Sequence, residues 1–94
     1  MRLVLSEQEG ATLVERDQFK AFAVELHGAV DLDAFGVLPA DNGEVLVPAG
    51  WVESLASDAG ADWVSAFRDM LRASEPYGWY DSRSGLIRAH IAPR

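Results

Sequence analysis

The stretch YGWYDSRSGLIRAHI, residues 77–91, predicts two β-strands joined by a short loop. The first run, 77–81, and the second, 86–91, contain the aromatic and branched side chains that favour strands, and the polar residues between them are typical of a turn. A loop of four residues pairs Asp81 with Leu86 in an antiparallel arrangement. The carboxyl end of the chain is therefore expected to form a β-hairpin.

This pairing sorts the side chains of the hairpin onto two faces, because successive residues of a strand point to opposite sides of a sheet. Trp79 then lies beside Arg88, and Tyr77 lies beside His90, so that these four residues share one face. A register shift of one residue would change these partners. The opposite face is expected to pack against helices and carries Gly78, Tyr80, Ile87, Ala89 and Ile91.

A second hairpin is predicted around Asp41-Asn42-Gly43, because Asn-Gly tolerates the positive φ angles of a tight hairpin turn. Its arms are the apolar runs 34–38 and 44–47. Pro39 restricts the first arm to an edge position or ends it early, since proline cannot donate a hydrogen bond to a neighbouring strand. Pro48 ends the second arm.

Two helices are predicted in the following part of the chain. Pro48 suits the start of a short helix over 49–58, whose apolar residues recur on one face. Asp62 is placed to cap a second helix with a clear 3.6-residue apolar period, and Pro76 follows as its stop. Trp51 and Trp63 lie on the periodic faces of these helices and are assigned to the core.

The first quarter of the chain is ambiguous between strand and helix. Leu3-Val4-Leu5 suits a short strand or the approach to a helix. Ser6 and Glu9 have the spacing of a capping box, which predicts a helix that begins near Glu7. Asp17 offers a second cap, and Gly28 is placed where such a helix would end.

The later half of this segment favours a helix because four apolar residues recur on one helical face: Phe19, Phe22, Ala23 and Leu26. A strand over 20–26 remains an alternative, since the residues opposite that face are not strongly polar. On the helical interpretation, His27 is expected to contact the last carbonyls of the helix.

These elements together predict one domain over residues 1–94. The chain has 94 residues, of which 49% are hydrophobic, enough for one modest core. We expect an α+β fold in which two β-hairpins form an antiparallel sheet and two or three helices pack on one face. The absence of cysteine excludes disulfides and thiolate metal sites.

Negative charge is distributed unevenly along the chain. The formal net charge is −7, which disfavours binding to nucleic acid or to anionic membranes. Residues 21–67 contain no Lys or Arg, whereas the carboxyl end carries three arginines, Arg83, Arg88 and Arg94. The longest uncharged stretch, 45–52, is too short to span a bilayer, and we expect a cytoplasmic protein. The acidic face is predicted to include Asp31, Asp33, Asp41, Glu44 and Glu53.

No motif in the sequence predicts a cofactor, a metal site or a catalytic centre. The segment that starts at Asp31 resembles the opening of a calcium loop, but it has Phe35 and Asn42 where two ligands belong. His27 and His90 are the only histidines, and no spacing fixes them together. No serine lies in a glycine-flanked elbow. An enzyme is therefore the less favoured interpretation.

The four residues Tyr77, Trp79, Arg88 and His90 favour a role in binding, because aromatic rings with a neighbouring cation are enriched at protein interfaces. We expect a small acidic non-enzymatic interaction domain whose partner is another protein or a second copy, as in a homodimer. The competing interpretation is that these rings fill the core.

Two other functions are left open by the sequence. The same face could hold a small anion through Arg88 and His90, as a ligand-binding or catalytic domain. Alternatively, the acidic residues could dock onto a basic partner, as in an acidic mimic or antidote protein.

Overall fold

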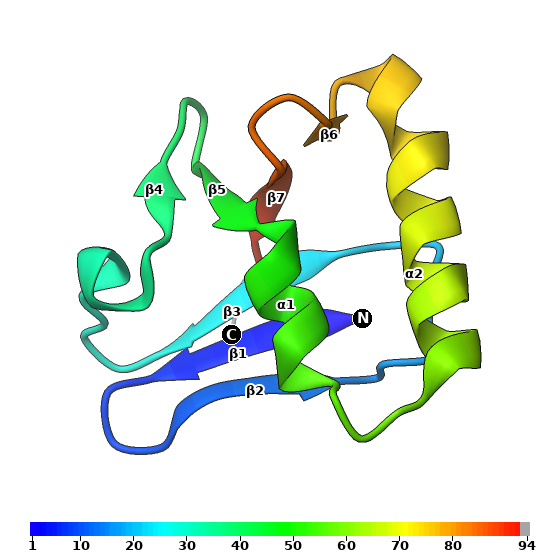
Figure 1. Cartoon of the computed structure of the whole chain (residues 1–94). Helices are drawn as coiled ribbons and strands as arrows, with labels where there is room; N and C mark the ends of the chain where they lie inside the picture. Colours follow the sequence, from blue (N-terminus) through cyan, green and yellow to red (C-terminus); the bar gives the residue numbers. More distant parts are fainter. Residues whose placement is uncertain (93–94) are drawn as a thin grey trace.

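Seven strands form one mixed β-sheet in the computed structural model, which describes residues 1–92, and two α-helices accompany them (Figure 1). The strand order is β2-β1-β3-β7-β5-β4, and β6 also pairs with β7. The elements are β1 (Arg2–Ser6), β2 (Gly10–Val14), β3 (Ala23–His27), the 3-10 helix η1 (Leu32–Phe35), β4 (Leu38–Pro39), β5 (Glu44–Pro48), α1 (Ala49–Leu55), α2 (Ala61–Ser74), the 3-10 helix η2 (Glu75–Tyr77), β6 (Tyr80–Asp81) and β7 (Leu86–Ile91).

The α+β class and the two α-helices agree with the sequence prediction, and the predicted antiparallel sheet of two hairpins is correct only for part of a larger mixed sheet. Strands β1 and β2, β4 and β5, and β6 and β7 form antiparallel hairpins, and β5 also pairs antiparallel with β7. Strand β3, however, pairs parallel with β1 on one side and with β7 on the other. The difference arises because the amino-terminal segment supplies three strands instead of helices.

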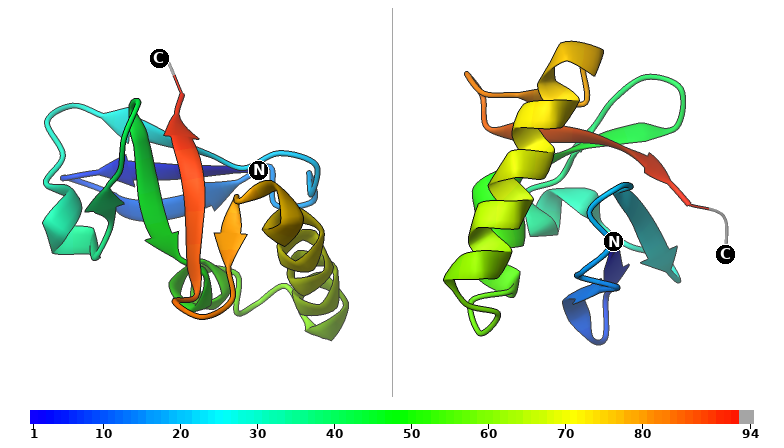
Figure 2. Two further views of the ribbon diagram at one scale, coloured as in Figure 1. Left: turned by 90° about the horizontal axis from the view of Figure 1, so that it is seen from above. Right: turned by 90° about the vertical axis from the view of Figure 1, so that its right-hand side faces the viewer.

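The sheet bends strongly between β3 and β7, which pair over two residues each, Ala23 with His90 and Val24 with Ile91. Strands β5 and β7 cross above β1, β2 and β3, with α1 and α2 on the same side of this arrangement (Figure 2). Apolar side chains from both halves of the sheet and from the two helices fill the interior. The fully buried large side chains are Leu3, Leu5, Val24, Val37, Val45, Val47, Val52 and Phe67.

In place of the helices favoured between Glu7 and Gly28, the structure has β2, a loop and β3, so the alternative of a strand within 20–26 is the one that holds for β3. The Ser6 hydroxyl accepts hydrogen bonds from the backbone N–H groups of Gln8 and Glu9, as a capping box would require, but it does so in the turn between β1 and β2. Gly10 ends this turn with φ +80°. Ser6 thus accepts the hydrogen bonds expected at the start of a helix, but the turn that it stabilises is followed by strand β2.

The second hairpin has the predicted turn but a shorter first arm. Asn42 and Gly43 have φ values of 60° and 73°, and the N–H of Glu44 donates to the carbonyl of Asp41 at 3.1 Å. Strand β4 contains two residues, because the preceding residues form η1.

The two predicted helices are present with shifted ends. Helix α1 stops at Leu55, three residues before the predicted end at Asp58. Helix α2 starts at Ala61 with Gly60 as its N-cap, so Asp62 lies in the first turn and does not cap it. Trp63 is buried as predicted, and Trp51 is half-buried against Phe35, with ring centroids 6.2 Å apart.

Candidate functional site

The carboxyl-terminal hairpin has the predicted register close to its turn. Asp81 lies opposite Leu86 and Tyr80 opposite Ile87, and the N–H of Arg88 donates to the carbonyl of Trp79 at 2.8 Å. Gly85 closes the four-residue loop with φ 72°. Trp79 and Arg88 are therefore neighbours across the hairpin.

Tyr77, in contrast, is not the partner of His90. It lies in η2, where its side chain is exposed, because strand β6 begins only at Tyr80. The position opposite His90 is occupied by Ala23 of β3 on one side and by Glu44 of β5 on the other. Strand β3, whose parallel pairing with β7 the sequence did not predict, thus takes the place expected for Tyr77.

The two faces of β7 have opposite environments. Ile87 and Ala89 are buried, and Ile91 and the neighbouring Tyr80 pack against the core. Arg88 and His90 alternate with these residues and point to the other side of the sheet. The predicted assignment of the inner face is confirmed for all of its members that lie on strands.

The outward side of this half of the sheet forms a surface that we call the outer hairpin face. Leu38, Leu46 and Arg88 lie opposite one another on β4, β5 and β7, and the backbone bond from Arg88 continues this row to Trp79. No helix crosses this face in the view from above (Figure 2). Leu38 and Trp79 are 46% and 37% exposed. The outer hairpin face consists of Leu38, Glu44, Leu46, Trp79, Arg88 and His90.

Glu44 holds both basic side chains of the outer hairpin face. Its carboxylate accepts a hydrogen bond from Arg88 Nη1 at 3.0 Å and lies 3.4 Å from His90 Nδ1. The Glu44 side chain is only 10% exposed, so these two neighbours cover it. The ring of His90 also contacts the indole of Trp79, with centroids 5.2 Å apart. The contacts fix the orientation of the polar side chains on this face.

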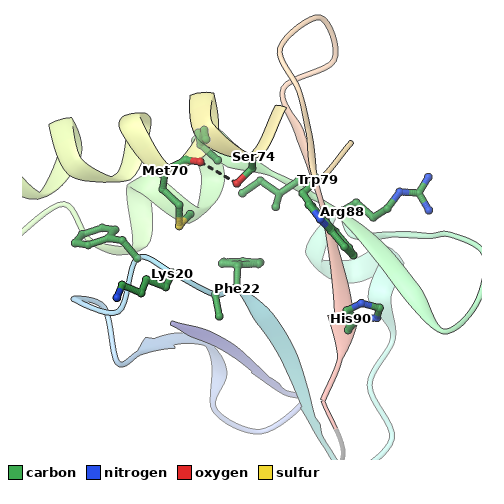
Figure 3. A pocket seen from close by; sticks show the side chains of 11 residues that line it. Lys20, Phe22, Met70, Ser74, Trp79, Arg88 and His90 are labelled. Carbon is green, nitrogen blue, oxygen red and sulfur yellow. Dashed lines mark hydrogen bonds between the residues drawn. The ribbon is translucent and has the colours of Figure 1, made fainter. Parts of the chain in front are cut away.

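A pocket of about 240 Å³ lies beside this face, between α2, the loop before β3 and β7 (Figure 3). Lys20, Ser74, Arg88 and His90 supply its polar groups. The walls are largely apolar and include Phe19, Phe22, Met70, Leu71, Trp79 and Ile87. Three of the four predicted binding residues therefore line the pocket, and Tyr77 does not.

The residues of the predicted acidic face are separated by their local roles. Glu44 pairs with Arg88, and Glu53 lies 2.9 Å from Arg68 Nε. Asp31 caps η1 by accepting the N–H of Asp33, and Asp41 lies in the turn between β4 and β5. Two of the five carboxylates are thus engaged by cations of the same chain.

His27 does not end a helix, contrary to the prediction. It lies at the end of β3, where its Nε2 is 3.1 Å from a carboxylate oxygen of Glu25. Within residues 1–92 no group of three or more His, Asp or Glu side chains is placed to hold a metal ion. Arg94, one of the three arginines of the predicted basic end, lies outside the described residues.

Sequence reasoning missed several residues of both sites. Leu38 and Leu46 could have been found, because the Asn-Gly turn sets their pairing and Leu46 alternates with two inward valines. Lys20, Phe22 and Met70 could not have been found, because the pocket brings the loop before β3 to helix α2. No local pattern in the sequence predicts that contact.

Comparison of this chain with protein-family models, with curated proteins and with solved structures finds no match. No helix within the described residues combines the length and the apolar character needed to cross a membrane. The function is therefore argued from the geometry of the molecule.

Proposed function

We propose that this protein is a small interaction domain that associates with a second copy of itself through the outer hairpin face. The observation that carries this proposal is the row of Leu38, Leu46 and Arg88 on the outward side of β4, β5 and β7, which is extended by Trp79 just before β6. A sheet face that exposes apolar side chains such as Leu38 and Trp79 is stabilised when a partner removes their area from water.

The charge of the face favours a second copy as the partner. The chain carries a formal net charge of −7, so two copies repel each other over most of their surfaces. The outer hairpin face instead contains one carboxylate, Glu44, and one guanidinium, Arg88, which form an ion pair. The formal charges of this ion pair cancel. Two copies can therefore approach here with the least electrostatic cost.

The size of the face indicates a weak dimer. Strands β4, β5, β7 and β6 contain two, five, six and two residues. At about 3.3 Å per residue and about 4.8 Å between strands, they give a footprint of roughly 240 Å². Stable interfaces bury about 800 Å² per partner. Association through this face alone is therefore expected in the micromolar range or weaker, with exchange between monomer and dimer.

Leu46→Glu tests the proposal, because Leu46 is central in the row and its replacement by a carboxylate places two like charges together in the dimer. Sedimentation velocity over a concentration series is expected to show a rising mass for the unaltered protein. The Leu46→Glu variant is expected to remain monomeric, with association weakened at least about tenfold.

Two controls separate the face from general effects of charge and aromatic content. Ser65→Glu adds the same charge on the exposed side of α2, and Tyr77→Ala removes an exposed ring that lies off the strands. Both are expected to associate like the unaltered protein. The proposal is wrong if the unaltered protein stays monomeric up to millimolar concentration. It is also wrong if Ser65→Glu weakens association as much as Leu46→Glu does.

A further inference from the structure

The pocket between α2 and β7 has the walls of a site for a small aromatic molecule. Phe19, Phe22 and Trp79 supply three rings, and Met70 contributes a polarizable thioether. The side chains of Phe22, Met70 and Trp79 border the same space (Figure 3). The volume of about 240 Å³ lies below the range of about 300–1,000 Å³ typical of sites for drug-sized ligands. The dimensions therefore suit a ligand with a single ring.

The cation at the pocket is the second observation. Carboxylates of the chain lie within ion-pair distance of Arg2, Arg16, Arg68, Arg72 and Arg88. Within residues 1–92, Lys20 and Arg83 are the lysine and arginine side chains without such a partner. Lys20 lines the pocket, whereas Arg83 lies in the turn between β6 and β7. Lys20 is exposed at the edge of the pocket, and Figure 3 draws its ammonium on the side away from Phe22 and Trp79. An unpaired ammonium at the edge of an apolar pocket favours an anionic ligand whose charged group stays at that edge.

The other polar groups set the direction of such a ligand. The Ser74 hydroxyl donates to the carbonyl of Met70 at 2.8 Å, so its oxygen can only accept a further hydrogen bond and does not attract an anion. The Arg88 guanidinium is held by Glu44. Lys20 lies at the end of the pocket away from His90 (Figure 3). A carboxylate would therefore face Lys20, and the ring would lie toward Trp79.

We propose that this pocket binds a small monocarboxylate that carries an aromatic ring, with Lys20 as the residue that recognises the carboxylate. The ring displaces water from the apolar walls and the ammonium neutralises the charge. This binding site goes beyond the proposed self-association. The pocket shares Trp79, Arg88 and His90 with the outer hairpin face, but Lys20, which recognises the carboxylate, is not a member of that face.

Phenylacetate and its neutral amide, phenylacetamide, test the proposal as a matched pair of probes. Two-dimensional NMR is expected to show saturable shifts at Lys20, Phe22 and Met70 with phenylacetate, with a Kd of about 1 mM. Phenylacetamide is expected to bind about tenfold more weakly, because it lacks the charge that Lys20 recognises.

Three variants locate the site. Lys20→Ala is expected to reduce phenylacetate binding about tenfold, to the level of the amide, while Arg83→Ala removes the other unpaired cation and leaves binding unchanged. Ala21→Trp places a large ring at an exposed position of the pocket wall and is expected to abolish binding of both probes. Circular dichroism and thermal unfolding confirm that each variant is folded.

The Leu46→Glu variant makes the two proposals separable, since it should lose association and still bind phenylacetate. Shifts that do not saturate up to about 10 mM phenylacetate would overturn the ligand proposal. Equal affinity for the acid and the amide, or equal losses in the Lys20→Ala and Arg83→Ala variants, would also overturn it.

Discussion

Glu44 shows how one side chain decides the chemical character of a surface. It occupies the strand position opposite His90 and binds Arg88 from the same strand as that histidine. The register that places these residues together belongs to the pairing of β5 with β7, which lies between the two hairpins and is not set by either turn. The ion pair removes Arg88 from use as an anchor for anions and leaves a neutral patch on a strongly acidic chain. The proposed site for an anion is instead Lys20 at the pocket.

The pair formed by Arg16 and Asp58 provides a test at the scale of single residues. Arg16 donates to both carboxylate oxygens of Asp58, at 2.9 and 3.3 Å. The hydrogen bond from Arg16, with help from the backbone and from the charge of Arg16, holds the pKa of Asp58 below its ordinary value of 3.8. A lowered folded-state pKa means that the pair stabilises the fold above about pH 4 and loses this effect as the pH falls through the folded-state pKa.

Arg16→Gln is expected to raise the pKa of the Asp58 carboxyl toward 3.8, because the charge and the paired hydrogen bonds are lost together. Carbon-detected NMR titration of the side-chain carboxyl measures this change directly. Arg83→Gln serves as the control, since Arg83 has no contact with Asp58, and should leave the titration of Asp58 unchanged. An Asp58 titration that is identical in the Arg16→Gln variant would refute this account of the pair.

At the scale of elements, the sequence predicts turns well and the amino-terminal strands poorly. The Asn-Gly turn and the loop before Gly85 require local conformations that few other residues adopt, so they could be recognised without knowledge of the fold. Phe19 and Phe22 have helical spacing although they do not lie in a helix. Both pack against the core from the loop before β3, and the strand itself alternates, with Val24 buried and Glu25 outward. Tertiary packing, not local periodicity, sets this segment.

Trp63 fastens that loop to helix α2. Its indole N–H donates to the carbonyl of Arg16 at 2.9 Å, and its ring stacks on Phe67 with centroids 5.0 Å apart and contacts Phe19 at 5.9 Å. The side chain therefore joins the helix, the loop and the core. This role could not be predicted from the helical period alone, which placed Trp63 in the core without identifying the loop it holds.

Trp63→Ala is expected to lower the free energy of unfolding by about 3–5 kcal/mol, a large part of the roughly 5–14 kcal/mol expected for a chain of this size. Trp79→Ala is the matched control. It removes the same side chain from a position that is 37% exposed and should cost less than about 1 kcal/mol. Urea denaturation of both variants measures the difference. Equal losses would show that Trp63 does not hold the loop and helix together.

At the scale of the whole molecule, β7 is the strand on which the architecture depends. It pairs with β5 along one edge, and β6 and β3 share its other edge, β6 near the turn and β3 near the carboxyl end. The pocket borders β7 and includes residues that precede both β6 and β3. One edge of β7 is thus shared by an antiparallel strand, β6, and a parallel strand, β3, which pairs residues 23–24 with 90–91. No local pattern in the sequence could predict this long-range pairing.

Hydrogen exchange tests this topology across the chain. Strand β7 has hydrogen-bonded neighbours on both edges, whereas β2 pairs only with β1. Amides of β7 are therefore expected to exchange on the order of a hundredfold or more slower than the amides of β2 that point away from β1. In β3, protection should alternate where β7 no longer pairs with it. Uniform protection of successive amides over residues 17–27 would instead indicate the helix that their apolar spacing predicts, and it would contradict the mixed sheet on which both proposed sites are built.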